Sequence, residues 1–358
     1  MNTPVTGIHH VTAVASDPQA NVDFYAGLLG LRLVKKTVNF DDPSAYHLYY
    51  GDESGSPGTA LTFFYWPGLG ARGRVGAGQS TAIVFSAPPA SLDYWDARMR
   101  LNGVKAARLR RFGEDTLRFA DPDGISVEIV AAEGDARTGW TGGDVPAEYA
   151  LRGFHTAELT VRDAAPTARL LTETMGFRKV REEDGRIRFA ASGDTPGAYA
   201  DLLTEPAPPG AGGAGTIHHV AWSVPDDEAE LRMREDLRRA GYYVSPVRDR
   251  NYFHSIYYPE PGGILFEIAT EGPGFTIDES LADLGSGLML PGPFEKARAA
   301  IEQALPPIRP PKPFKAPAAD EVKTTGRTTA KISGQHAQRL SGGDQLDALR
   351  PRTDRRRI

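Results

Sequence analysis

Hydrophobic and polar positions follow the same plan four times along the chain. In residues 7–67, 78–132, 152–206 and 216–271, an apolar or alternating β-rich run comes first, then apolar residues at helical spacing, then three more β-rich runs. Each repeat therefore reads as a βαβββ module. We predict an α+β protein in which four βαβββ modules pair into two open half-barrel domains, each half-barrel leaving an accessible cavity.

The first predicted helix carries clear boundary signals. Asp17 and Pro18 supply an N-cap and a first-turn proline, and Gly30 closes the segment. Between them, apolar residues such as Tyr25 and Leu28 recur at helical spacing. The run from Ser91 to Gly103 and its counterparts near residues 164–177 and 227–242 occupy the same place in the other modules.

Domain boundaries follow from these modules. Residues 1–140 are expected to hold the N-terminal pair and residues 150–306 the C-terminal pair, which ends in a closing helix near residues 294–305. The glycine-rich stretches 68–78 and 206–215 read as linkers, since neither lies between a strand and a helix as a nucleotide-binding loop would. Residues 310–358, rich in Pro, Lys and Arg with few large apolar side chains, read as a basic, disordered or loosely attached tail.

Composition excludes several classes of protein. The 358 residues contain no cysteine, so disulfides, thiolate metal sites and iron–sulfur clusters are excluded. No apolar stretch approaches the roughly 20 residues that span a bilayer, and the N-terminus lacks a signal sequence, so we expect a cytoplasmic protein that does not bind membranes.

Charge is distributed unevenly along the chain. From Arg309 onward there are 12 Lys and Arg against 5 Asp and Glu. Because the whole chain carries −5 and this tail +7, the body carries −12. An acidic body argues against a nucleic-acid partner for the folded part.

A histidine doublet opens two of the four modules. The first module begins Ile8-His9-His10-Val11 and the fourth begins Ile217-His218-His219-Val220, in the same register. Neighbouring side chains of a strand point to opposite faces, so we expect one histidine of each doublet to face the cavity. The matching register puts the same member inward in both modules.

A carboxylate completes the pattern. Glu267 lies inside the apolar last strand of the fourth module, where an unpaired carboxylate is costly unless it binds a cation. Two imidazoles and one carboxylate form a facial set that suits Fe(II) and leaves positions open for substrate and dioxygen; Mn(II) accepts similar ligands. We predict His10, His219 and Glu267 as the metal ligands.

A rival set stays open at this point. His155, in the opening strand of the third module, could replace His10 beside His219 and Glu267. In the module alignment, however, His155 falls beside His9 and His218, which would point it away from a metal bound by His10 and His219. An isolated histidine in a strand is more often structural, so His47 and His336 are given no role.

Five further residues surround the predicted ligands. His9, Thr12 and His218 flank them in the opening strands, and Arg250 and Tyr257 lie in the middle strands of the fourth module. We expect these groups to position the ligands and substrate or to move protons. Ordinary strand decoration is the competing interpretation for Arg250 and the tyrosines.

The modules, doublets and glutamate resemble the vicinal oxygen chelate superfamily, which includes glyoxalase and the extradiol dioxygenases. Within it, GIHHVT, AYHLYYGDESGSPGT, TIHHVAWSV and YFHSIYYPEPGGILFEIATE are similar to the hydroquinone and chlorohydroquinone ring-cleaving dioxygenases, from about residue 4 to 305. The resemblance implies Fe(II) held by His10, His219 and Glu267, with His9, Thr12, His218, Arg250 and Tyr257 around it.

The activity implied by this resemblance is cleavage of a small aromatic diol by O2. A homodimer is compatible with the architecture, although the residues do not establish one. Two alternatives remain open. A glyoxalase-type isomerase or lyase would normally need a second carboxylate, which the last strand of module one, ALTFFYW, lacks. A non-catalytic protein that binds aromatic compounds or quinones is the other.

Overall fold

The computed structural model describes residues 5–68 and 70–322, and all structural statements refer to them. It contains the four predicted βαβββ modules. The first module consists of β1 (Gly7–Val14), α1 (Pro18–Val22), η1 (Asp23–Leu28), β2 (Arg32–Val38), β3 (Tyr46–Gly51) and β4 (Ala60–Tyr65). The second consists of β5 (Gln79–Ala87), η2 (Pro89–Ser91), α2 (Leu92–Leu101), β6 (Ala107–Arg111), β7 (Glu114–Ala120) and β8 (Ser126–Ala131).

The other two modules repeat this order. The third consists of β9 (Gly153–Thr160), α3 (Ala164–Arg169), η3 (Leu170–Thr174), β10 (Arg178–Glu183), β11 (Arg186–Ala190) and β12 (Tyr199–Leu203). The fourth consists of β13 (Ile217–Val224), α4 (Asp227–Arg239), β14 (Arg248–Asp249), β15 (Phe253–Pro259) and β16 (Leu265–Pro273). The closing segment contains η4 (Phe275–Ile277), η5 (Gly292–Ala297) and α5 (Arg298–Ala304).

The first helix begins where its sequence signals place it. The Asp17 side chain accepts hydrogen bonds from the amides of Gln19 and Ala20, and Pro18 occupies the first turn. The helix then widens into the π-helical segment η1, and the helix of the third module widens in the same way into η3. The α-helical expectation therefore holds for the first turns and not for the later ones.

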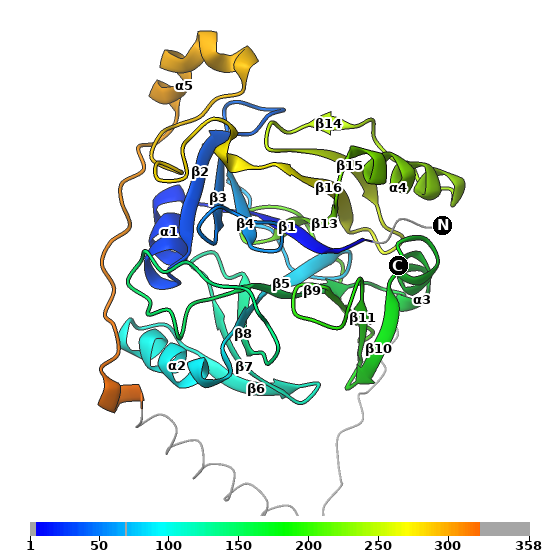
Figure 1. Ribbon diagram of the computed structural model, residues 1–358, viewed down its shortest axis with the longest axis horizontal. Coiled ribbons are helices and arrows are strands. Elements are labelled where there is room, and N and C mark those ends of the chain that lie inside the picture. The colour runs from blue at the N-terminus through cyan, green and yellow to red at the C-terminus, as the bar shows by residue number, and fades with distance from the viewer. Residues whose placement is uncertain (1–4, 69, 323–358) are drawn as a thin grey trace, which may run out of the picture.

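Two eight-stranded sheets form the body (Figure 1). The first has the order β14-β15-β16-β13-β1-β4-β3-β2, and the second β10-β11-β12-β9-β5-β8-β7-β6. Module one thus shares a sheet with module four, and module two with module three. The expected pairing of consecutive modules within residues 1–140 and within 150–306 is not the pairing found in the sheets.

Burial of the first strand explains this order. All eight residues of β1 are buried, so the strand needs a hydrogen-bonding neighbour on each edge. Its own module supplies β4 in parallel on one edge, and β13 pairs antiparallel on the other. The two predicted linkers run side by side between the sheets, joined by bridges such as Arg72↔Ala214 and Arg74↔Ala211.

The second sheet encloses a hollow that is filled by charged side chains. The Arg188 guanidinium donates to both carboxylate oxygens of Asp201 at 2.7 and 2.8 Å and to Glu114 at 2.6 Å. Arg111 pairs in the same way with Glu128. Only about 10 Å³ remains free, so this half-barrel has no room for a substrate.

The beginning of the tail is packed on the body, which corrects part of the prediction for residues 310–358. The Arg309 amide donates to the Gln19 side chain, and the Lys315 backbone exchanges two hydrogen bonds with Asn102. Gln19 belongs to α1 of module one, and Asn102 is the C-cap residue of α2 in module two. Residues 306–316, the strap, therefore join both halves of the molecule (Figure 1). The tail from residue 323, including His336, lies outside the described residues.

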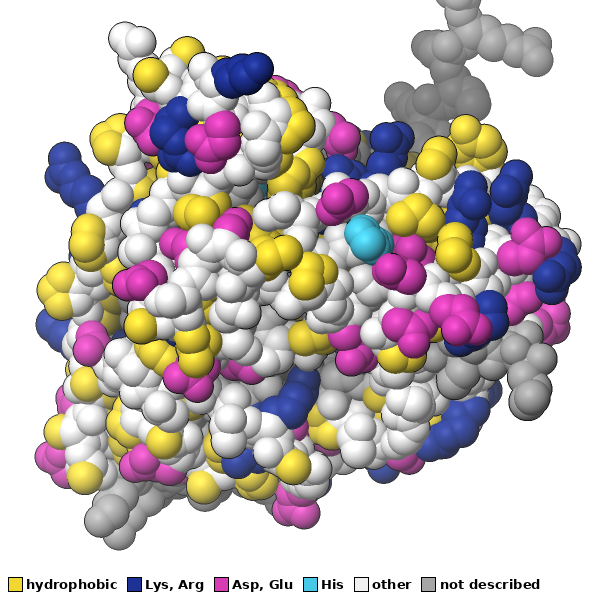
Figure 2. All heavy atoms as spheres, turned by 45° about the horizontal axis from the view of Figure 1, so that its top comes forward, with side chains coloured by type: hydrophobic (Ala, Val, Ile, Leu, Met, Phe, Trp, Pro, Cys, Tyr) yellow, Lys and Arg dark blue, Asp and Glu magenta, His cyan; other side chains and the backbone are white. Residues whose placement is uncertain are grey.

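Charged side chains of both signs share the molecular surface. On the face drawn in Figure 2, Lys and Arg are interspersed with Asp and Glu rather than gathered into a basic stripe. Within residues 5–68 and 70–322, no helix is long and apolar enough to cross a membrane.

We expect Phe314→Ala to destabilise the protein by about 1–2 kcal/mol, because the partly buried ring packs on the η1 backbone at Gly27. Lys315→Ala is the matched control, since that residue holds the strap through its backbone. Its effect should stay within about 0.5 kcal/mol. Urea unfolding measures the stability of both variants. Equal losses of stability would argue against packing of the Phe314 ring as the source of the effect.

A second prediction concerns Glu114 in the charged hollow. Burial opposes ionisation, but hydrogen bonding and charge from His155 and Arg188 hold the pKa of Glu114 at about 2. A depressed carboxyl pKa stabilises the fold above the unfolded value, and this stability is lost as pH falls from about 4.5 toward 2.

Accordingly, Glu114→Gln should lose about 1–3 kcal/mol at pH 7, after allowance for the partial exposure of the side chain, and progressively less as pH falls below 4.5. The control is Asp115→Asn, whose exposed pair with Arg110 predicts a change within about 0.5 kcal/mol at every pH. Denaturant unfolding at pH 7, 4 and 3 tests the trend. A loss for Glu114→Gln that does not vary with pH would contradict it.

Candidate metal centre

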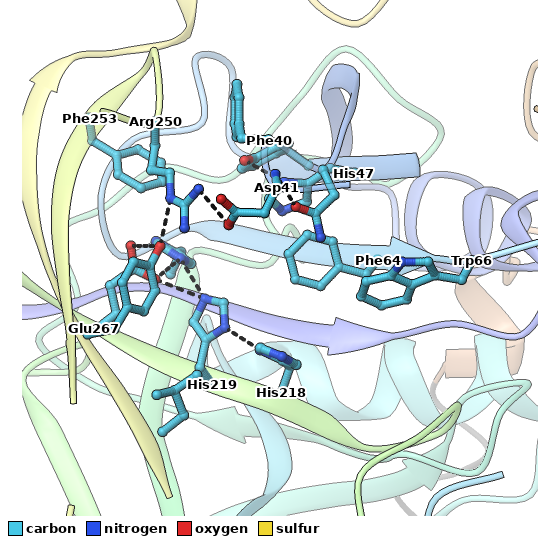
Figure 3. A pocket seen from close by; sticks show the side chains of 15 residues that line it. Phe40, Asp41, His47, Phe64, Trp66, His218, His219, Arg250, Phe253 and Glu267 are labelled. Carbon is cyan, nitrogen blue, oxygen red and sulfur yellow. Dashed lines mark hydrogen bonds and ion pairs between the residues drawn. The ribbon is translucent and has the colours of Figure 1, made fainter. Parts of the chain in front are cut away.

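A cavity of about 280 Å³ lies in the hollow of the first sheet, between modules one and four (Figure 3). Histidines and acidic groups line one part of it and aromatic side chains another. The lining residues are His10, Asn39, Phe40, Asp41, His47, Tyr49, Phe64, Trp66, His218, His219, Arg250, Phe253, Tyr257, Leu265 and Glu267.

The three predicted metal ligands meet in this cavity. His219 Nε2 lies 2.9 Å from Glu267 Oε2, and His10 Nε2 lies 3.2 Å from the same oxygen. The two imidazole Nε2 atoms are 3.2 Å apart. Among the described residues, these three form a buried group whose potential ligand atoms all lie within 4.8 Å of one another.

Each histidine doublet contains a β-bulge. In the pairing of β1 with β13, Ile8 and His10 face consecutive partners, which leaves His9 as an extra residue, and His218 is the extra residue of β13. The bulges change the expected strict alternation of faces. His218 lines the same cavity as His219 instead of pointing to the other side.

Hydrogen bonds determine the proton positions on the first doublet. His9 Nε2 lies 3.0 Å from the Thr270 carbonyl, which can only accept, so this nitrogen carries a proton. In neutral His9, Nδ1 is then an acceptor, and the proton of the 2.8 Å contact belongs to His10 Nδ1. The lone pair of His10 Nε2 therefore points toward Glu267. This is the tautomer that a metal ligand requires.

The charge state of the three side chains favours binding of a cation. Burial opposes ionisation of Glu267, but the adjacent His10 and His219 hold the pKa of that carboxyl well below its usual range. Burial lowers the pKa of His219, and burial with the neighbouring His10 lowers the pKa of His9 to about 3. The centre thus combines an ionised carboxylate with a His219 imidazole whose protonation burial opposes.

Glu267 also has an unsatisfied oxygen. The carboxylate is fully buried, yet Oε2 accepts no hydrogen bond of adequate geometry. A buried acceptor of this kind is rare unless an ion or water satisfies it. With two imidazole Nε2 atoms close to the same oxygen, the arrangement fits a divalent cation.

Arg250 and Tyr257 are linked to the other oxygen of Glu267. The Tyr257 hydroxyl donates to Glu267 Oε1 at 2.9 Å, and Arg250 Nε donates to that hydroxyl oxygen at 3.0 Å. Burial and the Glu267 charge raise the pKa of Tyr257 far above its ordinary value, so the hydroxyl remains protonated. Both residues lie where they can position the carboxylate.

Two predicted neighbours, His9 and Thr12, do not line the cavity. The His9 ring lies behind His10 and against Phe253, with ring centroids 5.0 Å apart. Thr12 forms a 2.7 Å hydrogen bond with Thr62. Thr62 in turn contacts His47 Nε2 at 2.9 Å. Thr12 therefore acts on the site only through other side chains.

The structure does not assemble the rival set. His155 belongs to the second sheet, where it is the extra residue of a bulge in β9 and lies 3.2 Å from Glu114. Its place in the bulge matches His9 and His218, as the module alignment indicated, and Thr156 occupies the ligand position. His155 lines the charged hollow and is absent from the residues around the cavity of His10 and His219.

Apart from His10, sequence reasoning missed the residues that module one contributes to the cavity. His47, left without a role, is buried in the wall, and burial lowers the pKa of its imidazole well below the ordinary value. Phe64 and Trp66 extend this wall (Figure 3). Tyr49 of module one pairs with Thr62, just as Tyr257 of module four pairs with Glu267. An alignment of these two tyrosines would have placed His47, two residues before Tyr49, beside the site.

Comparison with known proteins identifies relatives over most of the chain. A "Putative ring-cleaving dioxygenase MhqO" of Bacillus subtilis (strain 168) is 47% identical over 303 residues, covering 84% of this chain and 96% of that protein. A "Chlorohydroquinone/hydroquinone 1,2-dioxygenase" of Sphingobium indicum is 36% identical over 290 residues, covering 79% and 90%.

Solved structures agree with this grouping. The crystal structure of a protein described as a putative dioxygenase from Bacillus subtilis superposes with a TM-score of 0.83 at 45% identity, covering 87% of this chain and 99% of that one. Glyoxalase I from Zea mays, at 13% identity and a TM-score of 0.55 over 74% of this chain and 92% of its own, shares the fold alone.

The family model described as "Glyoxalase/Bleomycin resistance protein/Dioxygenase superfamily" matches residues 7–129 and 153–268. These two ranges cover modules one and two and modules three and four, so the match includes both histidine doublets and Glu267. On this match and on the close relatives, the chain belongs to the Glyoxalase/Bleomycin resistance protein/Dioxygenase superfamily.

Proposed function

We propose that this protein is an Fe(II)-dependent, extradiol-type ring-cleaving dioxygenase that opens a hydroquinone- or catechol-type aromatic diol with O2. One observation carries the proposal: His10, His219 and Glu267 converge on one point of a cavity whose walls are largely aromatic. The names of the relatives, including a chlorohydroquinone/hydroquinone 1,2-dioxygenase, support the same substrate class.

His10, His219 and Glu267 would hold the metal. An Fe(II) ion held there would supply open positions for the diol oxygen and dioxygen, acidity for the diol hydroxyl and a route for electrons between the two substrates. Mn(II) accepts the same ligand types. The contacts of His10 with His9 and of Glu267 with Tyr257 keep the ligand atoms aimed at the ion.

His218 is suited to move a proton in the cavity. A metal at His219 Nε2 requires the His219 proton on Nδ1, which is 2.7 Å from His218 Nδ1. His218 then carries its proton on Nε2. Its first-doublet counterpart, His9, is tied to a backbone carbonyl, whereas the described hydrogen bonds of His218 leave Nε2 available. We therefore assign general acid–base chemistry to His218.

The remaining walls would orient the ring. Phe253, with its centroid 5.1 Å from that of His10, and Phe64 offer flat apolar surfaces to an aromatic substrate. Arg250 would hold the Tyr257 hydroxyl in position beside Glu267.

Glyoxalase-type chemistry has less support from this site. Thr62 of β4 occupies the position in module one that Glu267 of β16 occupies in module four. Thr62 lies opposite Thr12, and Glu267 lies opposite the equivalent residue, Ala221. A second carboxylate ligand from module one would be expected at that position, and threonine is not a substitute for it.

Three ligand variants test the metal centre. His10→Ala, His219→Ala and Glu267→Ala should each lower the affinity for Fe(II) by more than the roughly 10–100-fold loss expected for Tyr257→Phe, which removes only a partner of a ligand. His155→Ala, as control, should retain the ion. Anaerobic metal titration and bound-iron analysis provide the measurement. Retention by His10→Ala together with loss by His155→Ala would move the site to the rival set.

Oxygen uptake tests the reaction. The Fe(II)-reconstituted protein should consume one O2 per diol cleaved when given hydroquinones or catechols, with Glu267→Ala inactive. An oxygen electrode and mass spectrometry of the products measure this stoichiometry. Turnover of a hemithioacetal without O2 uptake would instead indicate an isomerase. Tight binding of diols without any turnover would indicate a binding protein.

A further inference from the structure

An ion pair connects two modules at the cavity that holds the candidate metal centre. Asp41, in the loop between β2 and β3 of module one, accepts from Arg250 Nη1 of module four at 3.0 Å. The Asp41 side chain is 65% exposed and that of Arg250 15%, so the carboxylate is the solvent-facing partner. Figure 3 shows the two groups facing each other above His218 and His219.

The loop holds Asp41 in place through its neighbours. The Asp41 amide donates to the Asn39 side chain at 2.8 Å. Asp42 accepts from Trp66 Nε1 at 2.8 Å, and Trp66 belongs to the cavity wall. Hydrogen bonds of the loop therefore fix the backbone around Asp41, which keeps its carboxylate close to Arg250.

Arg250 is the only Lys or Arg among the described residues that line the cavity. Two of the three guanidinium nitrogens already donate to protein groups, Nε to Tyr257 and Nη1 to Asp41. A substrate carboxylate entering the cavity would thus find the one nearby cation already neutralised by Asp41.

Counting charges in the cavity leads to a specificity rule, which rests on the proposed function. A divalent cation is balanced by ionised Glu267 and one phenolate of a bound diol. The positive charge of Arg250 is balanced by Asp41. A diol without other charges leaves the site neutral, whereas a ring that also carries a carboxylate adds an uncompensated negative charge close to Asp41 and Glu267. The repulsion is strongest from the fully buried Glu267, and solvent weakens the part that comes from the exposed Asp41.

From this balance we infer that Asp41 is a specificity-determining residue that restricts the site to diols without an acidic substituent. It does so by neutralising Arg250 and by repelling anions at the cavity. Removal of its charge would leave the Arg250 guanidinium free to pair with a ring carboxylate. Carboxylated dihydroxybenzenes, poor ligands of the natural protein, would then become good ones.

The test compares two isosteric variants in the full-length, Fe(II)-loaded protein. Asp41→Asn removes the charge and keeps the shape of the loop. The matched control is Asp249→Asn, at a residue next to Arg250 in sequence but outside the cavity lining. The Asp249 side chain accepts a hydrogen bond from the Asn251 amide, and asparagine can also accept it. Dissociation constants for hydroquinone and 2,5-dihydroxybenzoate are measured without oxygen by calorimetry or by quenching of tryptophan fluorescence.

We expect the natural protein to prefer hydroquinone over 2,5-dihydroxybenzoate. Asp41→Asn should shift the ratio of the two affinities toward the carboxylated ligand by about tenfold or more, and Asp249→Asn should leave the ratio unchanged. Added salt should reduce the preference of the natural protein, because the Asp41 carboxylate is largely exposed to solvent.

Two outcomes would overturn the inference. One is an affinity ratio that is the same in Asp41→Asn as in the natural protein. The other is an equal loss of affinity for both ligands in Asp41→Asn, which would mean that the ion pair only stabilises the structure. Because binding is measured without O2, the result is separate from the ring-cleavage test: a shifted ratio without oxygen uptake would retain the specificity rule and reject the dioxygenase.

Discussion

The structure of the first half-barrel depends on a carboxylate buried between two imidazoles. Glu267 has no exposed surface, and its Oε2 atom has two histidine nitrogens near it without an adequate hydrogen bond. Such an arrangement is unfavourable in a protein interior unless a cation resolves it. The surrounding contacts, from the Thr270 carbonyl through His9 and from Arg250 through Tyr257, maintain the lone-pair directions that make the arrangement useful.

Both half-barrels bury a carboxylate at the same position of the last strand of a module, but its surroundings differ. Asp201 holds the same register position in β12 as Glu267 holds in β16, but in the second hollow the Arg188 guanidinium reaches the carboxylate. Arginine supplies charge and directional hydrogen bonds and fills the space. The free volumes, about 10 Å³ against about 280 Å³, separate a structural hollow from one that admits a ligand.

The four modules and the convergence of His10, His219 and Glu267 could be predicted from the sequence, because strand and helix periodicities and a repeated doublet are local signals. The bulges at His9 and His218 could not, since they depend on how β1 and β13 align with each other. The strap on α1 and α2 and the contact of Asp41 with Arg250 also arise between distant segments. No repeated motif marks either contact in the sequence, so neither could be predicted.

The order of the strands also affects how the protein can be made. β1 pairs with β13, and the contacting rings of His10 and His219 are 209 positions apart in the chain. As the ribosome releases the polypeptide from its N-terminus, β1 must wait for most of the protein to be synthesised before that edge is covered. Such late closure slows folding and leaves an apolar strand edge open to self-association. Nascent-chain protection and expression temperature should therefore influence the yield of this protein strongly.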